Sequence, residues 1–355
     1  MKALVRYDTK PKSLDCREIT EPLIPKNDWV KVKVGYCTIC ASDITMLNED
    51  MSKPNSKQVP PVVPGHEGSG TIVEIGSDVK RFNIGDRVVY ETTQNPCGEC
   101  EYCKSGNLNM CEKRDSLGSN INGSFAEYVV CSERCLHKID DDTPLSVVTL
   151  AEPLAVCVHM VEEMGDVKKG DNVVIIGNGP IGLLCGYVAK KVGANVMIVG
   201  TGRSQHRIEF SKYLGLTPCI NGDNLVENVK EFCNGKLADV AIEAVGRQST
   251  FNDVINITKK MGKIIVGTTG KHNGDNAYEA TINRPLCFNK QLSMIWSYSS
   301  RPSSWNIAVE YLNKDYKVLE KLISKKYKLE DWEEAFEATR NADTLKIEFE
   351  IGGEY

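Results

Sequence analysis

The 355-residue sequence has no apolar run of about 18 residues, and its opening MKALVRYDTK lacks the apolar stretch of a signal peptide. Neither a membrane span nor a secretion signal is therefore expected, and we expect a cytoplasmic protein. A net charge of -5 provides no basic surface of the kind that binds nucleic acid. Internal repeats and low-complexity segments are also lacking. With 41% hydrophobic and 26% charged residues, the composition is that of an ordinary globular protein, long enough for two domains.

The fourteen cysteines are not spaced like a disulfide framework, because four of them fall within fifteen residues. In a reducing compartment, such crowding favours a metal site. A small thiol is often buried in a core, so most of the scattered cysteines are expected to be small core or surface residues. These are Cys16, Cys37, Cys131, Cys135, Cys157, Cys185, Cys219, Cys233 and Cys287.

The pattern of strands and helices changes near Leu150. The first 150 residues consist of short β-rich pieces broken by turn residues, which predicts a barrel-like β domain. Apolar strands then alternate with helical stretches from 171–176 (DNVVII) to 262–269 (GKIIVGTT), which predicts an α/β domain with a doubly wound parallel sheet. The tail becomes helical and charged, and it closes on KIEFEIG, a strand expected to return to the first domain.

A glycine motif, GNGPIG, follows the first of these apolar strands and opens a helix. Its glycines permit a tight turn and let the backbone and helix N-terminus approach a pyrophosphate. We therefore predict a dinucleotide site. The residues assigned to it from this motif are Gly177, Gly179, Pro180, Ile181 and Gly182.

The choice of nicotinamide cofactor usually depends on an acid about 20 residues after this loop, which binds the ribose 2′-hydroxyl. Here Gly202 stands at the expected position of the acid. Arg203 and Ser204 follow it, with Arg207 as a second cation, and a planar guanidinium suits a 2′-phosphate. NADP is therefore favoured over NAD, and the alternative is that Arg203 is a solvated surface charge.

A loop rich in Gly, Asn and Pro carries Cys97, Cys100, Cys103 and Cys111, with the spacing C-x2-C-x2-C-x7-C. Two-residue gaps let successive thiolates meet one tetrahedral cation, and four thiolates leave no open position for a substrate. The pattern predicts a structural zinc site. An iron–sulfur cluster also takes four thiolates, and a metal-free loop is the remaining alternative.

A second zinc site is suggested by Cys40 in GYCTICASD, by His66 and Glu67 in PGHEGSG, and by Glu152 in AEPLAV. One Cys, one His and one carboxylate leave a fourth position open, where zinc can act as a Lewis acid on a hydroxyl or carbonyl. Taken singly, His66 is more often a hydrogen-bonded structural histidine, and Cys40 a buried thiol.

In combination, GYCTICASD, PGHE, the four-cysteine loop, AEPLAV and GNGPIG resemble the zinc-dependent medium-chain dehydrogenase/reductase superfamily in order and approximate spacing, over essentially the whole chain. EPLAV and the Glu that follows PGH are more similar to the polyol branch, with its sorbitol or iditol dehydrogenases, than to liver-type alcohol dehydrogenases. The resemblance implies a GroES-like catalytic domain at 1–155, completed by 290–355, and a Rossmann-type domain at 156–289.

The same resemblance implies roles for single residues. Cys40, His66 and either Glu67 or Glu152 would bind the catalytic zinc, and the other carboxylate would be an exchangeable ligand or would hold the zinc-bound water. Ser42 matches the hydroxyl that passes the substrate proton outward. Asp43 resembles the acid that orients the zinc-binding histidine. The alternatives are a turn hydroxyl for Ser42 and a cap for Asp43.

The sequence also departs from the family pattern. Thr45 stands where many relatives carry the outer histidine of the proton relay, and Gly202 replaces the acid of NAD-using sorbitol dehydrogenases. The stretch Met294 to Trp305 matches the region that reaches nicotinamide and substrate, which places Tyr298 at the cofactor. Serines stand near where sorbitol dehydrogenases carry a substrate-contacting Arg and Tyr, and a neighbouring arginine is a candidate for a substrate phosphate; these residues are Ser299, Ser300 and Arg301.

The resulting hypothesis is an oxidoreductase with two zinc ions per chain that transfers a hydride between NADP(H) and a secondary alcohol or ketone of a polyol or sugar-like substrate. Threonine, aldose or simple alcohol oxidation with NAD is the alternative within enzymes. A non-catalytic nucleotide-binding or zinc-storage protein would not need the open Cys40 and His66 pair with Ser42. A homo-oligomer, either tetramer or dimer, is expected from the resemblance alone.

Overall fold

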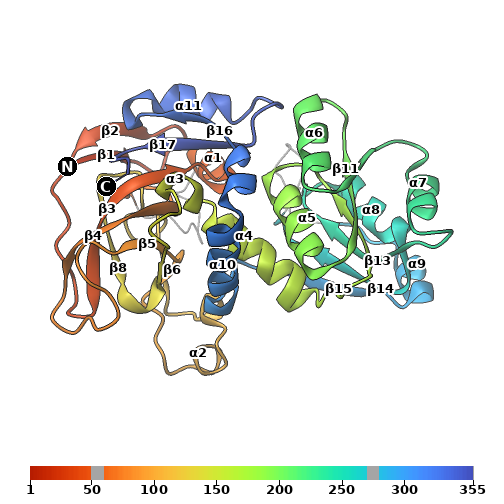
Figure 1. Ribbon diagram of the computed structural model, residues 1–355, viewed down its shortest axis with the longest axis horizontal. Coiled ribbons are helices and arrows are strands. Elements are labelled where there is room, and N and C mark those ends of the chain that lie inside the picture. Colours follow the sequence, from red (N-terminus) through yellow and green to blue (C-terminus); the bar gives the residue numbers. More distant parts are fainter. Residues whose placement is uncertain (49–59, 270–279, 355) are drawn as a thin grey trace. The chain divides into compact units, whose positions relative to one another are not determined.

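The computed structural model describes residues 1–48, 60–269 and 280–354 (Figure 1). The chain forms two compact units. One, here called the β-rich unit, comprises Met1–Ala155 with Arg301–Tyr355, and the other, the parallel-sheet unit, comprises Val156–Ser300. Two separate stretches of chain therefore build the β-rich unit.

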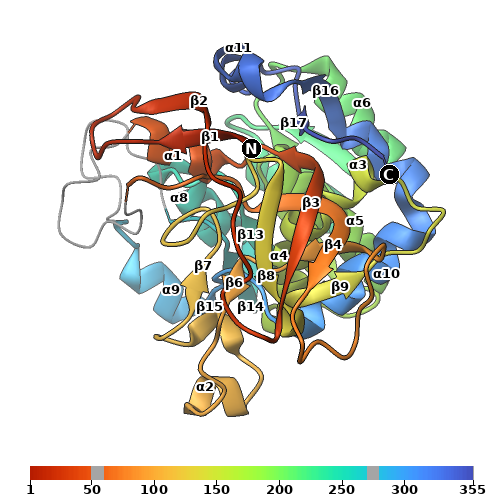
Figure 2. The same ribbon diagram turned by 90° about the vertical axis from the view of Figure 1, so that its left-hand side faces the viewer.

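The central strand of the β-rich unit is β3 (Trp29–Thr38), which has three strand partners (Figure 2). The main sheet has the order β16-β17-β3-β4-β5-β9, and β8 also pairs with β3. The first half of β3 lies antiparallel to β8, and its last three residues lie antiparallel to β17. The bounds of these partners are β4 Glu67–Ile75, β5 Arg87–Tyr90, β8 Tyr128–Ser132, β9 Leu136–Lys138, β16 Ile323–Tyr327 and β17 Lys346–Glu350.

Shorter elements complete the β-rich unit. Two strand pairs lie outside the main sheet, namely β1 (Lys2–Arg6) with β2 (Leu14–Glu18), and β6 (Thr93–Gln94) with β7 (Asp115–Ser116). Its helices are α1 Ala41–Asn48, α2 Glu101–Lys104, α3 Leu145–Val148, α10 Pro302–Leu319 and α11 Trp332–Ala338, and α4 (Ala151–Val158) crosses into the other unit. Short 3-10 turns are Leu108–Met110, Glu133–Cys135, Glu320–Leu322 and Leu329–Asp331.

The parallel-sheet unit contains six parallel strands in the order β12-β11-β10-β13-β14-β15. The strands are β10 Asn172–Ile176, β11 Asn195–Gly200, β12 Thr217–Ile220, β13 Ala238–Glu243, β14 Thr258–Val266 and β15 Ser293–Trp296. A helix follows each of the first five: α5 Pro180–Val192, α6 Gln205–Tyr213, α7 Leu225–Phe232, α8 Gln248–Ile257 and α9 Arg284–Lys290. The strand order reverses direction at β10, as the prediction of a doubly wound sheet requires.

The apolar runs read from the sequence form the core of this sheet. Val174 and Ile176 of β10 pack with Phe251 and Val254 of α8 on one face. Figure 1 shows α5 and α6 on one side of the sheet and α7, α8 and α9 on the other. Because both faces are covered, the strands are apolar on both sides, and this explains their continuous hydrophobic runs.

The tail predictions also agree with the structure. The tail that was expected to be helical contains α10 and α11, and KIEFEIG contains β17, which returns to pair with β3. The second boundary between the units lies at Ser300/Arg301 and not at 289/290, because β15 pairs with β14 and extends the parallel sheet. Across the described ranges, no helix is both long and apolar enough to cross a membrane.

Candidate active site, zinc lobe and nucleotide loop

Three potential metal ligands converge where β3 ends and β4 begins. Cys40 follows β3, His66 immediately precedes β4, and Glu67 is the first residue of β4. In the antiparallel register Thr38 lies opposite Glu67, so the end of one strand is beside the start of the other. One ligand atom from each of Cys40, His66 and Glu67 lies within 4.8 Å of the others, and both His66 and Glu67 are buried. This donor set fits a zinc ion with an open coordination position.

Asp43 lies behind His66, in the first turn of α1. Its Oδ2 accepts a hydrogen bond of 2.9 Å from the backbone N–H of Cys40, and its Oδ1 lies 3.6 Å from Nδ1 of His66. Within the described residues, Oδ1 is buried and has no hydrogen-bond partner. Burial lowers the pKa of His66, but Asp43, Cys40 and Glu152 raise it more, so that the net pKa lies well above its usual value. Asp43 therefore faces one ring nitrogen and leaves the other available to a metal.

Glu67 is held by two residues that the sequence analysis did not identify. Its Oε2 accepts hydrogen bonds from Oγ1 of Thr38 and from Nζ of Lys346, the first residue of β17. Lys346 is 5% exposed and also donates to the carbonyl of Ile39 at 3.0 Å. Burial lowers the pKa of Lys346, but Glu67 and Cys40 raise it by a larger amount. The net pKa therefore lies above its usual value, and the ammonium remains charged. The buried carboxylate therefore has a buried cation beside it.

Glu152 reaches the same region from the first turn of α4 but does not join the close group formed by Cys40, His66 and Glu67. Its Oε1 accepts a hydrogen bond of 3.2 Å from Oγ1 of Thr92. Burial raises the pKa of Glu152 to about 7, with nearby His66 opposing this shift and Glu67 adding to it. A carboxyl group that can hold or lose a proton near neutral pH thus lies next to the three potential ligands.

Ser42 and Thr45, the two positions expected on the path of the substrate proton, both lie in α1 but have different surroundings. Ser42 is exposed in the first turn of α1, two residues after Cys40. Thr45, which stands where relatives carry a histidine, donates its hydroxyl proton to the carbonyl of Ala41 at 3.1 Å. This hydrogen bond from a side chain to the carbonyl four residues earlier is common in helices, so Thr45 has an ordinary structural role.

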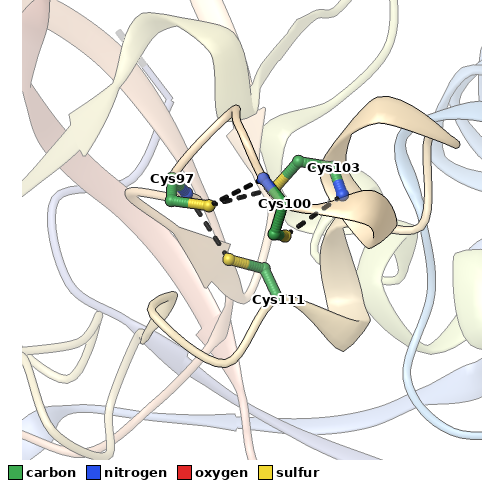
Figure 3. Close-up of side chains that lie close together, drawn as sticks. All are labelled: Cys97, Cys100, Cys103 and Cys111. Carbon is green, nitrogen blue, oxygen red and sulfur yellow. Dashed lines mark hydrogen bonds between the residues drawn. The ribbon is translucent and has the colours of Figure 1, made fainter.

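The four cysteines of the loop surround one small space (Figure 3). One sulfur from each of Cys97, Cys100, Cys103 and Cys111 lies within 4.8 Å of the others, and none forms a disulfide. Three backbone N–H groups of the cluster donate to sulfur at 3.4 Å: Cys97 to Cys111, Cys100 to Cys97, and Cys103 to Cys100. Such bonds stabilise thiolates, and four thiolates fit a closed tetrahedral zinc site.

The acidity of these thiols is unequal. Backbone N–H groups of Glu99 and Cys100 lower the pKa of Cys97 to about 6. Burial, together with hydrogen bonds to the neighbouring thiols, raises the pKa of Cys103 to about 12. Without a cation the cluster therefore cannot carry four negative charges, and a bound metal would have to displace the remaining protons.

The glycine loop in the parallel-sheet unit connects β10 to α5. Gly177 has a φ of +116°, a conformation that other residues rarely adopt. A Cβ atom on Gly182 would lie 1.8 Å from the carbonyl oxygen of Gly177, so the helix can approach the loop this closely only with glycine. Gly179 is the N-cap residue of α5, Pro180 and Ile181 open the helix, and a Cβ on Gly179 would meet no atom within 4 Å. The loop thus presents a helix N-terminus with open space before it.

The region expected to choose the cofactor follows β11. Gly202 has a φ of +73°, and Arg203 is exposed. Ser204 is buried and caps α6, its Oγ accepting a 3.2 Å hydrogen bond from the backbone N–H of Arg207. Ser204 therefore has a capping role in addition to the predicted cofactor contact.

A cavity of about 240 Å³ lies beside this region and beside the glycine loop. Its lining includes Asn178 of the loop, Gly200 and Gly202 at the end of β11, and Ile220 at the end of β12. These are the carboxyl ends of parallel strands, where nucleotides bind in open α/β sheets.

The stretch expected to contact substrate is divided between the units. Tyr298 is 41% exposed and Ser300 is buried, whereas Ser299 has a φ of +57°. Arg301 precedes α10 as its N-cap residue, and its guanidinium donates to Oδ1 of Asn107 at 3.1 Å. Arg301 thus contacts the loop that contains the four cysteines.

Some contacts of the site left little trace in the sequence. Lys346 is the one informative case, because a lone cation opens KIEFEIG, a strand that was already expected to join the first domain. Thr38 and Thr92 are ordinary strand and loop hydroxyls, and only the sheet register and the three-dimensional path reveal their partners.

Comparison with known proteins supports these observations over nearly the whole chain. Residues 26–141 match the family described as the alcohol dehydrogenase GroES-like domain, and residues 180–314 match the family described as zinc-binding dehydrogenase. D-arabitol-phosphate dehydrogenase of Enterococcus avium is 34% identical over 331 residues, covering 92% of this chain and 91% of the relative. Sorbitol dehydrogenase of Halalkalibacterium halodurans is 34% identical over 350 residues, covering 98% of each chain.

A solved structure gives the same result for the fold. Galactitol-1-phosphate dehydrogenase of Escherichia coli superposes with a TM-score of 0.85 at 26% identity, covering 99% of each chain. The predicted combination of a GroES-like and a Rossmann-type domain is confirmed. The chain therefore belongs to the zinc-dependent medium-chain dehydrogenase/reductase superfamily, in its polyol dehydrogenase branch, and is an enzyme of the zinc-dependent alcohol and polyol dehydrogenase family.

Proposed function

We propose that the protein transfers a hydride between NADP(H) and a secondary alcohol or ketone of a polyol or sugar-like substrate. The observation that carries this proposal is the group formed by the half-buried Cys40 and the buried His66 and Glu67, whose ligand atoms lie within 4.8 Å of one another. Three protein ligands leave a position for a substrate oxygen, whereas the four-thiolate lobe leaves none.

Cys40, His66 and Glu67 would hold the catalytic zinc, which supplies Lewis acidity toward the substrate oxygen. Glu67 is favoured over Glu152 as the ligand because its carboxylate belongs to the close group and Glu152 does not. Glu152 would then be the exchangeable carboxylate or hold a water molecule, in keeping with a pKa of about 7. Asp43 orients His66, and Ser42 accepts the proton lost by the substrate and passes it outward.

The second zinc would be held by Cys97, Cys100, Cys103 and Cys111 and would stabilise the loop that carries them. The N–H···S bonds and the absence of disulfides within the cluster support zinc over a metal-free loop. The zinc-binding dehydrogenase family supports zinc over an iron–sulfur cluster.

NADP is proposed as the preferred cofactor. Gly177, Gly179, Pro180, Ile181 and Gly182 would receive the pyrophosphate at the start of α5. The carboxylate that would select NAD is replaced by Gly202, and the exposed Arg203 beside it is free to meet a 2′-phosphate electrostatically. Arg207, Ser204 and Tyr298 are proposed as further cofactor contacts.

Polyols are proposed as substrates because D-arabitol-phosphate dehydrogenase and sorbitol dehydrogenase are relatives at 34% identity. A threonine, aldose or simple alcohol dehydrogenase that uses NAD is the alternative. Both would use the same zinc group, so a substrate panel must distinguish them.

A homo-oligomer is proposed as well, with the protein in the cytoplasm and without a nucleic-acid or membrane partner. β15 is the last strand of the parallel sheet, with no described strand on its outer side. Trp296 of β15 is 59% exposed, and Phe288 of the preceding helix is 82% exposed. A second copy of the chain would cover this edge and these rings.

The deciding experiment is a titration of the purified protein with NADPH and with NADH, followed by nicotinamide fluorescence. Tighter binding of NADPH, followed by turnover of pentitols, hexitols or their phosphates, is the expected result. Tighter binding of NADH would refute the assignment of Arg203. Turnover of L-threonine in preference to every polyol would refute the substrate class while leaving the zinc chemistry intact.

A further inference from the structure

A second buried carboxylate lies near the proposed zinc site but outside it. Glu348 of β17 is fully buried, and its two carboxylate oxygens accept hydrogen bonds from Oγ of Ser146 at 2.6 Å and from Oγ1 of Thr149 at 3.0 Å. The Thr149 hydroxyl shares its one proton with the carbonyl of Ser146, 2.6 Å away. Nζ of Lys326, on the neighbouring strand β16, lies 3.4 Å from the carboxylate of Glu348. Buried carboxylates are rare in cores unless their oxygens are occupied in this way, so the cluster is a built feature of the fold.

The two hydroxyl groups belong to the segment that leads to Glu152. Ser146 lies in α3, Thr149 is the C-cap residue of α3, and Glu152 lies in the first turn of α4, so the three residues follow one another at three-residue intervals along one short segment. The same segment is tied to β4, because Oγ of Ser69 donates to the carbonyl of Leu145 at 2.6 Å. Hydrogen bonds to two strands of the sheet therefore hold the segment that directly precedes Glu152.

The same two strands also position Glu67, the other carboxylate of the site, which is the first residue of β4. Across the sheet, Glu348 lies opposite Thr38, and Thr38 lies opposite Glu67, so the three residues form one transverse row. Two residues before Glu348, and on the same side of β17, Lys346 binds Glu67 directly. A single strand near the end of the chain therefore holds Glu67 through Lys346 and the Glu152 segment through Glu348.

We propose that Glu348 is a positioning residue of the active site: by accepting the hydroxyl groups of Ser146 and Thr149, it fixes the place of Glu152 relative to His66 and Glu67. This inference rests on the proposed function, in which Glu152 acts beside the catalytic zinc. Among the described residues, the hydrogen-bond and ion-pair partners of Glu348 are Ser146, Thr149 and Lys326, and none of them is a proposed zinc ligand.

The test compares Glu348→Met with Glu348→Gln in the full-length holoenzyme. Methionine removes both acceptor oxygens, whereas glutamine keeps one. The variant Glu350→Gln is the matched control, since Glu350 lies two residues further along β17 and pairs with Lys328 at 3.1 Å toward the surface. Zinc release to a competing chelator is measured together with kcat, the KM for the nicotinamide cofactor and the melting temperature.

For Glu348→Met we expect one of the two zinc ions to bind about 10-fold to 100-fold more weakly and kcat to fall by a similar factor, as for other residues that support metal ligands indirectly. The more tightly held zinc and the cofactor KM should not change. Glu348→Gln should recover most of the loss, and Glu350→Gln should match the wild type.

If Glu348→Met does not fold, the double variant Ser146→Ala/Thr149→Val replaces it, because it removes the two donors and leaves the strand intact. The proposal is wrong if these variants fold and retain wild-type zinc affinity and kcat, or if both zinc ions weaken equally. A wild-type protein without bound zinc or without dehydrogenase activity would instead refute the proposed function, so the two failures are distinct.

Discussion

Lys346 and Glu67 form a buried ion pair that joins the last strand of the chain to the first residue of β4. Both side chains are almost completely buried, and Thr38 donates a further hydrogen bond to the same carboxylate oxygen. A cation beside a buried carboxylate favours its charged form over its neutral form, and a metal ligand must be in the charged form. The pair therefore connects the stability of the β-rich unit to the proposed zinc chemistry.

Replacing Lys346 by Met should leave Glu67 as a buried charge without its cation. Removing one partner of a buried ion pair typically costs about 3–5 kcal/mol of stability, and bound zinc should offset part of this loss. The melting temperatures of Lys346→Met and Lys346→Arg, with and without a zinc chelator, measure the effect. Arginine keeps the charge and serves as the control. Equal stability of the Met variant and the wild type in chelator would show that the pair contributes nothing.

The sequence predicted the two groups of potential metal ligands that the structure brings together, and the four-cysteine group and the glycine loop are local patterns. The spacing of Cys97, Cys100 and Cys103 reflects the geometry of a metal-binding turn, and GNGPIG reflects a tight strand-to-helix connection, so neighbouring residues alone carry the signal. The apolar runs at 171–176 and 262–269 were read correctly for the same reason, since they fall on β10 and β14. Short or half-exposed elements such as β12 and α9 carry weaker patterns and were not located.

Contacts between distant strands could not be read in this way. Lys346 and Glu67 are 279 residues apart, and Ser146 and Glu348 are 202 residues apart. Their pairing follows from the register of β17 on β3 and of β3 on β4, which no local pattern specifies. The boundary at Ser300 was likewise missed, since β15 joins the parallel sheet through long-range pairing with β14.

Substitution of Cys40 by Ser should remove one zinc ion and abolish turnover, while the fold is retained. One of three ligands is lost, and the four-thiolate lobe is untouched. Metal analysis should give about two zinc ions per chain for the wild type and about one for the variant, with similar far-ultraviolet circular dichroism. Retained turnover in Cys40→Ser would contradict the proposed zinc mechanism.

Substitution of Cys103 by Ser should also reduce the zinc content from about two ions to one, but with a different consequence. A closed structural site contributes folding energy and no chemistry, so we expect a lower melting temperature and greater proteolysis in the loop that contains Cys97 to Cys111. The purified variant should keep most of its kcat at low temperature. An iron–sulfur chromophore in the wild type would overturn the zinc assignment of this lobe.

The cofactor assignment predicts a switch at Gly202. Aspartate tolerates a positive φ better than most residues, and a Cβ at Gly202 would be no closer than 3.4 Å to the side chain of Ile220. Gly202→Asp should therefore fold, repel a 2′-phosphate and accept a ribose hydroxyl. Arg203→Ala should weaken NADPH about 10-fold to 100-fold, the value of one charged hydrogen bond, with little effect on NADH. Unchanged NADPH affinity in both variants would exclude this region from phosphate recognition.

The buried carboxyl group of Glu348 predicts a pH-dependent stability of the β-rich unit. Burial raises its pKa from 4.5 to about 7, and the opposing groups are the hydroxyls of Ser146 and Thr149 and the ammonium of Lys326. Between these two pKa values the folded state binds more protons than the unfolded state, so stability falls as the pH rises from about 4.5 to about 7. Below this window the Glu348 carboxyl is protonated in both the folded and the unfolded state, so it costs no stability. Above the window it is ionised in both states, and the full free-energy cost of burying its charge remains.

Glu348→Gln replaces the titrating carboxyl group by an amide that does not titrate. The variant should therefore lack the contribution of Glu348 to the pH dependence of the free energy of unfolding. The shift corresponds to a change on the order of 3 kcal/mol, or up to about 10 °C in melting temperature for a unit of this size. Melting temperatures of the variant and the wild type, compared at pH 5, 6, 7 and 8, isolate Glu348 because every other titrating group is shared. Relative to the wild type, the variant should gain stability from pH 5 to about pH 7, and the difference should level off between pH 7 and pH 8. A constant difference across this range would mean that Glu348 titrates outside it, with Lys326 holding the carboxylate ionised at all these pH values.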